Sequence, residues 1–218
     1  MQRLTLYGAD YSVYVRIARM VLEETRVPYK LVEIDIFEKK KVPSDYADRH
    51  PFGKIPALEH DGFRLFETDA IAAYVIDLCG NRDLLPTTAK DRARTIQIMR
   101  IMDHYAYPSF VWGVFVEEVE RERVGQLDSA QVDLARKTLT VLDGLMGGSF
   151  LVGEQLTLAD LWAYPMFTYF GMAPTGQRLI AEFPRLGSWK DAMNRRPSAE
   201  ATRFPREAAA GEDDRTGN

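Results

Sequence analysis

Every strand-like pattern in this 218-residue chain lies within its first 66 residues, and this asymmetry is the strongest constraint on the fold. The clearest pattern is a hairpin. Two short segments, 57–59 and 64–66, flank Asp61-Gly62, a pair that is typical of tight hairpin turns. Residues 3–7 and 30–36 alternate polar and apolar side chains and predict two further strands.

Helices are expected around these strands. Asp10 or Ser12 is a suitable N-cap for a helix that runs to about Thr25. Residues 44–49 leave room for one or two helical turns, and a helix over 68–79 is expected to end at Gly80. The resulting order, β-α-β-α-β-β-α, predicts a small mixed sheet with helices packed on it.

The remainder of the chain predicts an all-helical second domain. Helices are expected over 91–123 with a disturbance at Tyr107-Pro108, and then over 129–146, 158–170 and 184–194. We therefore expect a first domain over 1–80, a linker over 81–88, a helical domain over 89–206 and a frayed tail over 207–218.

Composition excludes several functional classes. The net charge of −4, with acidic and basic residues mixed, argues against nucleic-acid binding. The single cysteine, Cys79, rules out a disulfide framework, and the widely spaced His50, His60 and His104 make a metal site unexpected. Apolar runs fall far short of the ~20 residues that span a membrane, and the N-terminus lacks a signal-peptide pattern, so we expect a cytoplasmic protein without membrane contact.

Five motifs occur in an order and spacing that resemble the cytosolic glutathione transferase family over nearly the whole chain. They are Tyr7-Gly8 with Ser12-x-x-x-Arg16, His50-Pro51-Phe52-Gly53-Lys54-Ile55-Pro56, Glu67-Thr68-Asp69-Ala70-Ile71, Leu156-Thr157-Leu158-Ala159-Asp160-Leu161, and Phe183-Pro184-x-Leu186-x-x-Trp189 with Arg196-Pro197-Ser198. The resemblance implies a thioredoxin-like N-terminal domain followed by an all-helical C-terminal bundle. It favours a serine-type member, similar to the theta, delta and phi classes, of a bacterial style.

This resemblance implies an enzyme that takes glutathione as co-substrate, uses no metal, and transfers the glutathionyl thiol to a hydrophobic electrophile in detoxification. The same fold also supports glutathione-dependent isomerase, dehalogenase or peroxidase chemistry. A third alternative is a non-catalytic protein that uses the fold for ligand binding or interaction.

The resemblance also assigns residues to glutathione. It implies that the peptide bond before Pro56 is cis and that the backbone of Ile55 pairs with the cysteinyl part of glutathione like an added strand. Glu67 and Thr68 are expected to bind the γ-glutamyl end, since an acid suits its ammonium and a hydroxyl at a helix start suits its carboxylate. Asp69 is an open alternative for the ammonium.

The glycyl carboxylate of glutathione requires a cation. Lys41, the last residue of a short basic run, stands where similar sequences often have histidine, and Lys54 adjoins Ile55. We expect both to contribute, although a basic run in a loop is often only solvated.

Ser12 is the expected activator of the thiol. Free thiols have a pKa near 8.5, and a hydroxyl donor at a helix N-terminus stabilises the thiolate over the thiol. Tyr11 and Tyr14 flank Ser12 and remain alternatives, whereas Tyr7 fits the non-catalytic tyrosine of serine-type members. Arg16 is expected to hold a carboxylate across the domain interface.

Residues of the helical domain are assigned more loosely. Tyr105, Tyr107 and Trp112 lie on the long expected helix and are candidates for an electrophile pocket.

Phe52 is expected to insert into a partner subunit, because an exposed loop phenylalanine is costly in a monomer, and a symmetric homodimer follows. Thr157 to Asp160 reads as a capping box that supports the fold.

Overall fold

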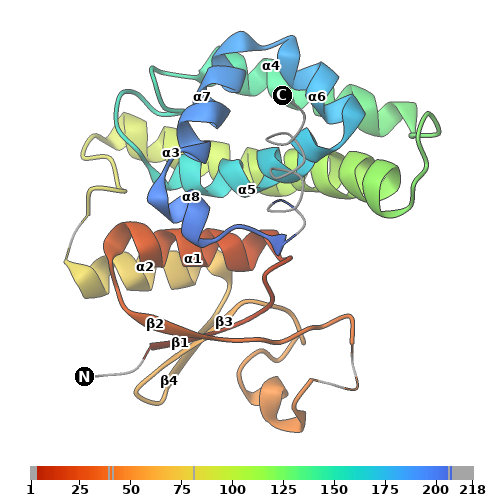
Figure 1. The fold of residues 1–218 in the computed structure, drawn as a ribbon. Helices are drawn as coiled ribbons and strands as arrows, with labels where there is room; N and C mark the ends of the chain where they lie inside the picture. The colour runs from red at the N-terminus through yellow and green to blue at the C-terminus, as the bar shows by residue number, and fades with distance from the viewer. Residues whose placement is uncertain (1–3, 39, 41, 81, 206, 208–218) are drawn as a thin grey trace. The chain divides into compact units, whose positions relative to one another are not determined.

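The computed structural model describes residues 4–38, 40, 42–80, 82–205 and 207 (Figure 1). The chain divides into two compact units, which are described separately. The first unit comprises Met1–Arg82 together with Pro197–Asn218, and the second comprises Asp83–Arg196.

The first unit is built on a four-stranded mixed sheet in the order β2-β1-β3-β4. Strand β1 (Leu4–Tyr7) pairs in parallel with β2 (Tyr29–Val32), while β3 (Ala57–His60) pairs antiparallel with both β1 and β4 (Phe63–Phe66). The sequence therefore predicted all four strands and the mixed sheet correctly. Strand β2 is shorter than the expected 30–36, and beyond it the Ile34 N–H donates to the carbonyl of Gly8, the residue that follows β1.

The hairpin between β3 and β4 turns at Asp61 and Gly62. Their φ angles are +51° and +83°, and a two-residue turn with positive φ at both positions matches the twist of the strands that it joins. The Asp-Gly pair thus predicted the turn correctly.

Two long helices cover one face of the sheet (Figure 1). They are α1 (Val13–Thr25) and α2 (Thr68–Cys79), which pack against each other. The buried side chains of β1, Leu4 and Leu6, alternate with the less buried Thr5 and Tyr7, as expected of a strand with one face in the core. The short helix η1 (Ser44–Asp48) confirms the expected helical turns.

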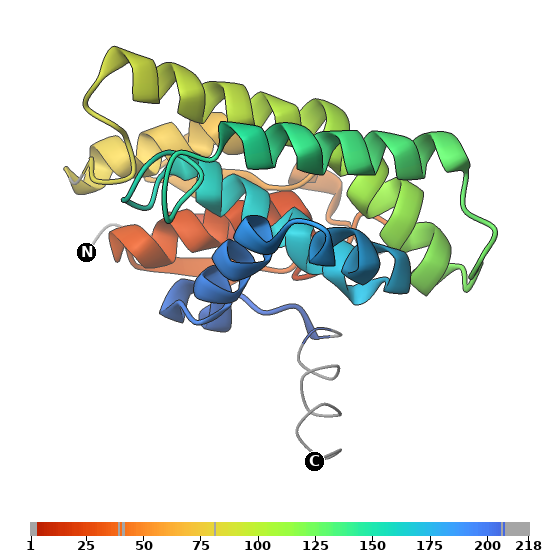
Figure 2. The ribbon, with the colours of Figure 1, turned by 90° about the horizontal axis from the view of Figure 1, so that it is seen from above.

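The second unit is entirely helical apart from an isolated bridge between Phe150 and Gly153, within the residues described. Figure 2 shows α3 (Ala89–Ile101) continuing into η2 (Met102–Glu120), with α4 (Ser129–Leu145) alongside. Helices α5 (Leu158–Met172), α6 (Pro174–Ala181) and α7 (Pro184–Asn194) complete it. Sequence periodicity predicted each of these except α6. None of the described helices is both long and apolar enough to cross a membrane.

The long helix expected over 91–123 changes character rather than ending. From Met102 onward η2 is a π-helix, closed at its end by the Arg121 N–H donating to the Val116 carbonyl. Pro108 lies inside it and has no N–H to donate, which is consistent with the disturbance that the sequence predicted there.

Helix α5 forms the centre of the second unit, since every residue from Leu158 to Phe170 is buried. Its start is fixed by the expected capping box. Asp160 accepts hydrogen bonds from the Thr157 N–H and hydroxyl, and from the Leu151 N–H and the Trp189 indole. Burial raises the pKa of the Asp160 carboxyl, and these four donors oppose that shift.

The C-terminal boundary differs from the expectation. Residues 197–206 were expected in the helical domain, but α8 (Pro197–Ala201) groups with the first unit because it packs on α1. Glu207 was expected at the start of a frayed tail, yet its carboxylate bonds the buried Arg16. Residues 208–218 lie outside the described part of the chain.

Candidate active site

Three chain segments meet at one residue of the sheet. Ala57 pairs with Tyr7 of β1 on one side and with Phe66 of β4 on the other. This register brings together the loop after β1, the segment before β3 and the residues after β4. The predicted residues Ser12, Ile55-Pro56 and Glu67-Thr68 lie in those three segments.

Ser12 is the N-cap of α1. Its Oγ accepts a hydrogen bond from the Val15 N–H at 3.3 Å, and its carbonyl accepts one from the Arg16 N–H at 2.9 Å. The contact with Val15 uses an acceptor lone pair, so the hydroxyl proton remains for donation. The first turn of α1 carries no acidic residue, and its positive end is therefore suited to a bound anion.

Gly8 allows the loop before Ser12 to approach α1. A Cβ at this position would lie 2.3 Å from Cγ2 of Val15, a residue fully buried in the first turn of α1. A larger residue would push α1, with its N-cap, away from the end of β1. This explains the Tyr7-Gly8 pair in the first motif.

The three candidate tyrosines have different surroundings. The Tyr11 hydroxyl donates to Asp35 at 2.8 Å, and burial together with Asp35 raises the pKa of Tyr11. Tyr14 is half-buried in the first turn of α1. Tyr7 lies under the Arg49 guanidinium, 4.8 Å from the ring centre, which agrees with a structural role.

The segment before β3 has the form that the resemblance implied. The Ile55–Pro56 peptide bond is cis, which confirms that prediction. The Tyr46 hydroxyl donates to the Lys54 carbonyl at 2.8 Å and thereby restrains the loop that precedes Pro56. Within the described residues, the backbone of Ile55 forms no hydrogen bond, so it is open to an added strand. The Lys54 side chain is exposed.

Glu67 and Thr68 join β4 to α2. Glu67 is the N-cap with φ +68°, an unusual backbone for glutamate, and its exposed side chain makes no capping bond. Strained residues of this kind persist where the surrounding structure requires them, often at ligand sites. Thr68 is buried at the first position of α2, while Asp69 accepts from the Ala70 N–H. The start of α2 at Thr68 agrees with the helix expected over 68–79, but the sequence did not indicate the positive φ of Glu67.

The structure adds one residue that sequence reasoning did not select. His50 is 3% exposed, its ring lies 4.9 Å from that of Phe66, and its Nδ1 has no hydrogen-bond partner among the described residues. Burial lowers the pKa of His50, the negative charge of Glu67 opposes this shift, and the charge of Lys54 adds to it. The protonation of His50 is therefore coupled to the charges of Glu67 and Lys54, two residues that are predicted to bind glutathione. A histidine within the motif that precedes Pro56 was the only available signal.

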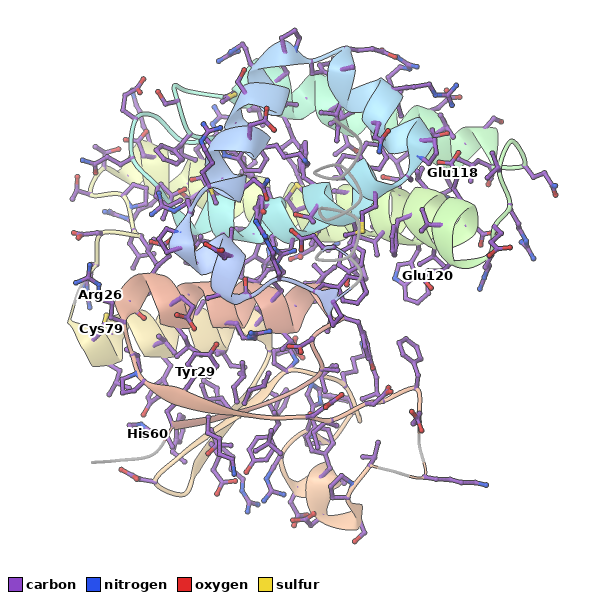
Figure 3. The ribbon with its side chains drawn as sticks, viewed as in Figure 1. Arg26, Tyr29, His60, Cys79, Glu118 and Glu120 are labelled. Atoms are coloured by element: carbon purple, nitrogen blue, oxygen red, sulfur yellow. The ribbon has the colours of Figure 1, made fainter. Side chains whose placement is uncertain are left out.

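Two further residues named in the sequence analysis are Lys41 and Cys79. Lys41 lies outside the described residues. Cys79 is half-buried near Arg26, the C-cap of α1, as Figure 3 shows, and is thus at the opposite end of α1 from Ser12. Among the described residues, no group of three or more histidine, cysteine, aspartate or glutamate side chains is arranged to hold a metal ion.

The aromatic residues predicted for an electrophile lie on η2. The rings of Tyr107 and Trp112 are 6.4 Å apart and nearly perpendicular, whereas Tyr105 is exposed and lies beside His104. Burial raises the pKa of Tyr107. Trp112 also borders a cleft of about 430 Å³, whose walls include charged and amide side chains but neither tyrosine.

Comparison with known proteins covers both units. The family model "Glutathione S-transferase, N-terminal domain" matches residues 6–82, and "Glutathione S-transferase, C-terminal domain" matches 101–197. The chain is 28% identical to glutathione S-transferase F6 of Arabidopsis thaliana over 211 residues, covering 92% of this chain and 99% of that protein. It is 29% identical to glutathione S-transferase 3 of Zea mays, covering 93% and 94%.

Solved structures agree with these matches. The crystal structure of glutathione transferase F7 from Populus trichocarpa is similar at a TM-score of 0.78 and 27% identity, covering 91% of this chain and 97% of that chain. These relatives are plant proteins. The expectation of a bacterial-style member therefore finds no support in them, and the serine-type assignment stays a prediction.

Proposed function

This chain belongs to the glutathione S-transferase family, and we propose that it conjugates glutathione to a hydrophobic electrophile. The observation that carries this proposal is the convergence at Ala57. Ser12, at a helix N-terminus with no acidic residue in its first turn, lies in the segment that follows Tyr7, the partner of Ala57 in β1. The unpaired Ile55 backbone lies just before Ala57, and the Glu67-Thr68 helix start directly follows Phe66, its partner in β4. Together they match the thiol, the peptide backbone and the γ-glutamyl end of one tripeptide.

In the proposed mechanism the backbone of Ile55 pairs with the cysteinyl residue of glutathione, which directs its sulfur toward the start of α1. Thr68 and the α2 N-terminus bind the γ-glutamyl carboxylate, while Glu67 binds the ammonium. Lys54 and Lys41 neutralise the glycyl carboxylate. These contacts place the sulfur before any electrophile arrives.

Ser12 then acts as a hydrogen-bond donor to the sulfur and does not itself attack. Lowering the thiol pKa by about two units requires ~2.7 kcal/mol of preferential thiolate stabilisation. One charge-assisted hydrogen bond and a helix N-terminus supply energies of that size. The thiolate attacks the electrophilic carbon, a carbon–sulfur bond forms, and the leaving group departs with the bonding electron pair. Tyr11 and Tyr14 stay secondary candidates for the donor.

The electrophile is proposed to bind against η2, at Tyr105, Tyr107 and Trp112. Aromatic side chains of this kind provide the apolar surface that a hydrophobic substrate requires. The close pairing of Tyr107 with Trp112 favours these two over Tyr105.

We further propose a cytoplasmic homodimer with a role in detoxification. Phe52 supports the dimer, because its side chain is 72% exposed although its ring also contacts Phe66. Exposure of so large an apolar side chain is explained by burial in a second copy of the chain.

The test is a titration of the protein with glutathione, measured by calorimetry and by the ultraviolet absorbance of the thiolate across pH. We expect saturable binding and a bound-thiol pKa well below the free value near 8.5. Absence of binding would overturn the transferase assignment. Binding with an unchanged thiol pKa would instead indicate a glutathione-binding protein without thiol activation.

A further inference from the structure

Helix α1 is held by the chain segment that follows the helical unit. Arg16 is 1% exposed, and its guanidinium bonds both carboxylate oxygens of Glu207, at 2.7 and 3.3 Å, and the Ala199 carbonyl at 3.3 Å. One turn further along, Arg19 donates to the Ala201 carbonyl at 2.9 Å. We refer to Ala199, Ala201 and Glu207 as the C-terminal clamp.

Both arginines are linked to Ser12. The Arg16 N–H donates to the Ser12 carbonyl, so the guanidinium and the N-cap belong to the same first turn. Arg19 also bonds Asp10, which lies two residues before Ser12 in the loop from β1. The clamp therefore restrains the chain on both sides of Ser12.

The buried charge of Arg16 requires an opposite charge as its partner. The buried guanidinium of Arg16 is tolerated because a carboxylate and a carbonyl accept hydrogen bonds from its two terminal nitrogens, and loss of the carboxylate leaves a buried charge uncompensated. A paired arginine also has a fixed orientation, since its planar fork bonds two oxygens at once. Hydrogen-bond strength falls steeply with angle, so a small tilt of the first turn changes how well the Ser12 hydroxyl points at a ligand.

We propose that Arg16 and Glu207 are positioning residues for thiol activation: the C-terminal clamp sets the orientation of Ser12 and of the α1 N-terminus toward the glutathione sulfur. This inference rests on the proposed function. It deepens that function by assigning part of the active-site geometry to residues at the far end of the sequence. Neither residue touches glutathione in this scheme.

The test replaces Glu207 by glutamine, which preserves shape and removes the charge. The readouts are the pKa of the bound glutathione thiol, from thiolate absorbance, and the dissociation constant of glutathione. We expect E207Q to raise the bound-thiol pKa by about 0.5–1 unit, which corresponds to loss of part of the hydrogen-bond and helix-dipole stabilisation. The dissociation constant should change by less than about threefold, because the glutathione-binding residues lie in other segments.

The matched control is Ser198→Ala. Ser198 precedes the clamp and donates to Glu24, in the last turn of α1, far from Ser12. S198A should leave the bound-thiol pKa at the wild-type value even if it lowers the melting temperature. This separates positioning of Ser12 from general stabilisation of α1.

The inference is overturned if folded E207Q has the wild-type bound-thiol pKa, or if S198A raises that pKa equally. Should E207Q not fold, Glu207→Asp is measured instead. It keeps the charge but shortens the reach of the carboxylate to the Arg16 guanidinium, and a wild-type thiol pKa in that variant also overturns the inference. A wild-type protein that binds no glutathione overturns the proposed function and this inference together.

Discussion

The Tyr11 hydroxyl donates a hydrogen bond to the Asp35 carboxylate at 2.8 Å, directly beside the serine that is expected to act on glutathione. The Tyr11 ring also packs on Phe37, with ring centres 5.4 Å apart. Burial and Asp35 both raise the pKa of Tyr11, so its proton is tightly held and already directed at a carboxylate. Ser12, by contrast, uses only an acceptor lone pair in its contact with Val15. The two neighbours thus differ in whether they have a proton to offer.

This difference predicts opposite outcomes for Ser12→Ala and Tyr11→Phe. S12A should return the bound-thiol pKa most of the way to about 8.5 and lower kcat/KM by roughly 10²-fold, the usual effect of losing a donor to a developing charge. Y11F should retain the lowered pKa. Both are measured by thiolate absorbance against pH. A lowered thiol pKa in S12A, or its loss in Y11F, would transfer the activating role to Tyr11.

Thr68 offers a test of the γ-glutamyl contact. Thr68→Val keeps the buried shape at the start of α2 and removes the hydroxyl. We expect the dissociation constant of glutathione to rise about tenfold or more, because a hydrogen bond to a charged group is worth roughly 1.5–3 kcal/mol. Thr68→Ser, which restores the hydroxyl, should bind as the wild type does. Calorimetric titration with glutathione measures these dissociation constants. If T68V bound glutathione as tightly as the wild type, the Thr68 hydroxyl would not be part of the binding site.

Asp160 should control the stability of the helical unit rather than chemistry. Asp160→Ala leaves the Leu151 and Thr157 N–H groups and the Trp189 indole without their acceptor. Each unsatisfied buried donor costs about 1–3 kcal/mol, so the free energy of unfolding should fall by about 3 kcal/mol or more. Urea unfolding measures this loss. Asp160→Asn retains one acceptor oxygen, so its free energy of unfolding should lie between those of the wild type and the alanine variant. An alanine variant as stable as the wild type would show that Asp160 does not stabilise the helical unit.

Phe52 provides the test of assembly. If the exposed ring is buried in a second subunit, Phe52→Ser should shift the sedimenting species from twice the mass of one chain toward a single chain. Phe63 is 49% exposed at the β-hairpin and serves as a control, since Phe63→Ser removes a comparable ring elsewhere. A monomeric wild type would contradict the dimer, and a dimeric F52S would locate the interface away from this loop.

Most of the fold was predictable because short-range signals determine it. The Asp61-Gly62 turn fixed the register that brings Phe66 opposite Ala57, and Ser12 and Thr157 marked their helix starts. Helix α6 was not predicted from the sequence. At its start the Thr175 N–H donates to the carboxylate of Glu118 (Figure 3), which lies on η2 and is distant in the sequence, so this contact has no local signature. The partner of Arg16 was equally out of reach, since 191 positions separate it from Glu207. For the site, the family resemblance pointed to Ser12, Pro56 and Glu67, whereas burial of His50 depends on packing against Phe66 and has no local signature.

His50 predicts a pH dependence of stability. Its pKa in the folded protein lies below its ordinary value of 6.5 because the ring is buried. At pH 7.5 and above the ring is almost entirely neutral in both states and contributes almost no pH dependence. As the pH falls through 6.5, the unfolded chain takes up a proton that the folded chain resists. The free energy of unfolding must then decrease, by at most about 1.4 kcal/mol per pH unit from this group.

The measurement is the free energy of unfolding from urea titrations between pH 7.5 and about 5, above the range in which ordinary carboxylates titrate. Wild-type stability should decline over this interval, and His50→Asn should flatten the decline whatever its stability at pH 7.5. His104→Asn is the matched control, because His104 is exposed, and an equal flattening of the decline in H104N would contradict the assignment to His50. The charges that face His50 act in opposite directions, Glu67 favouring the protonated ring and Lys54 opposing it. Lys54→Met should therefore reduce the decline, and a slope identical in wild type and H50N would show that His50 is not the group responsible.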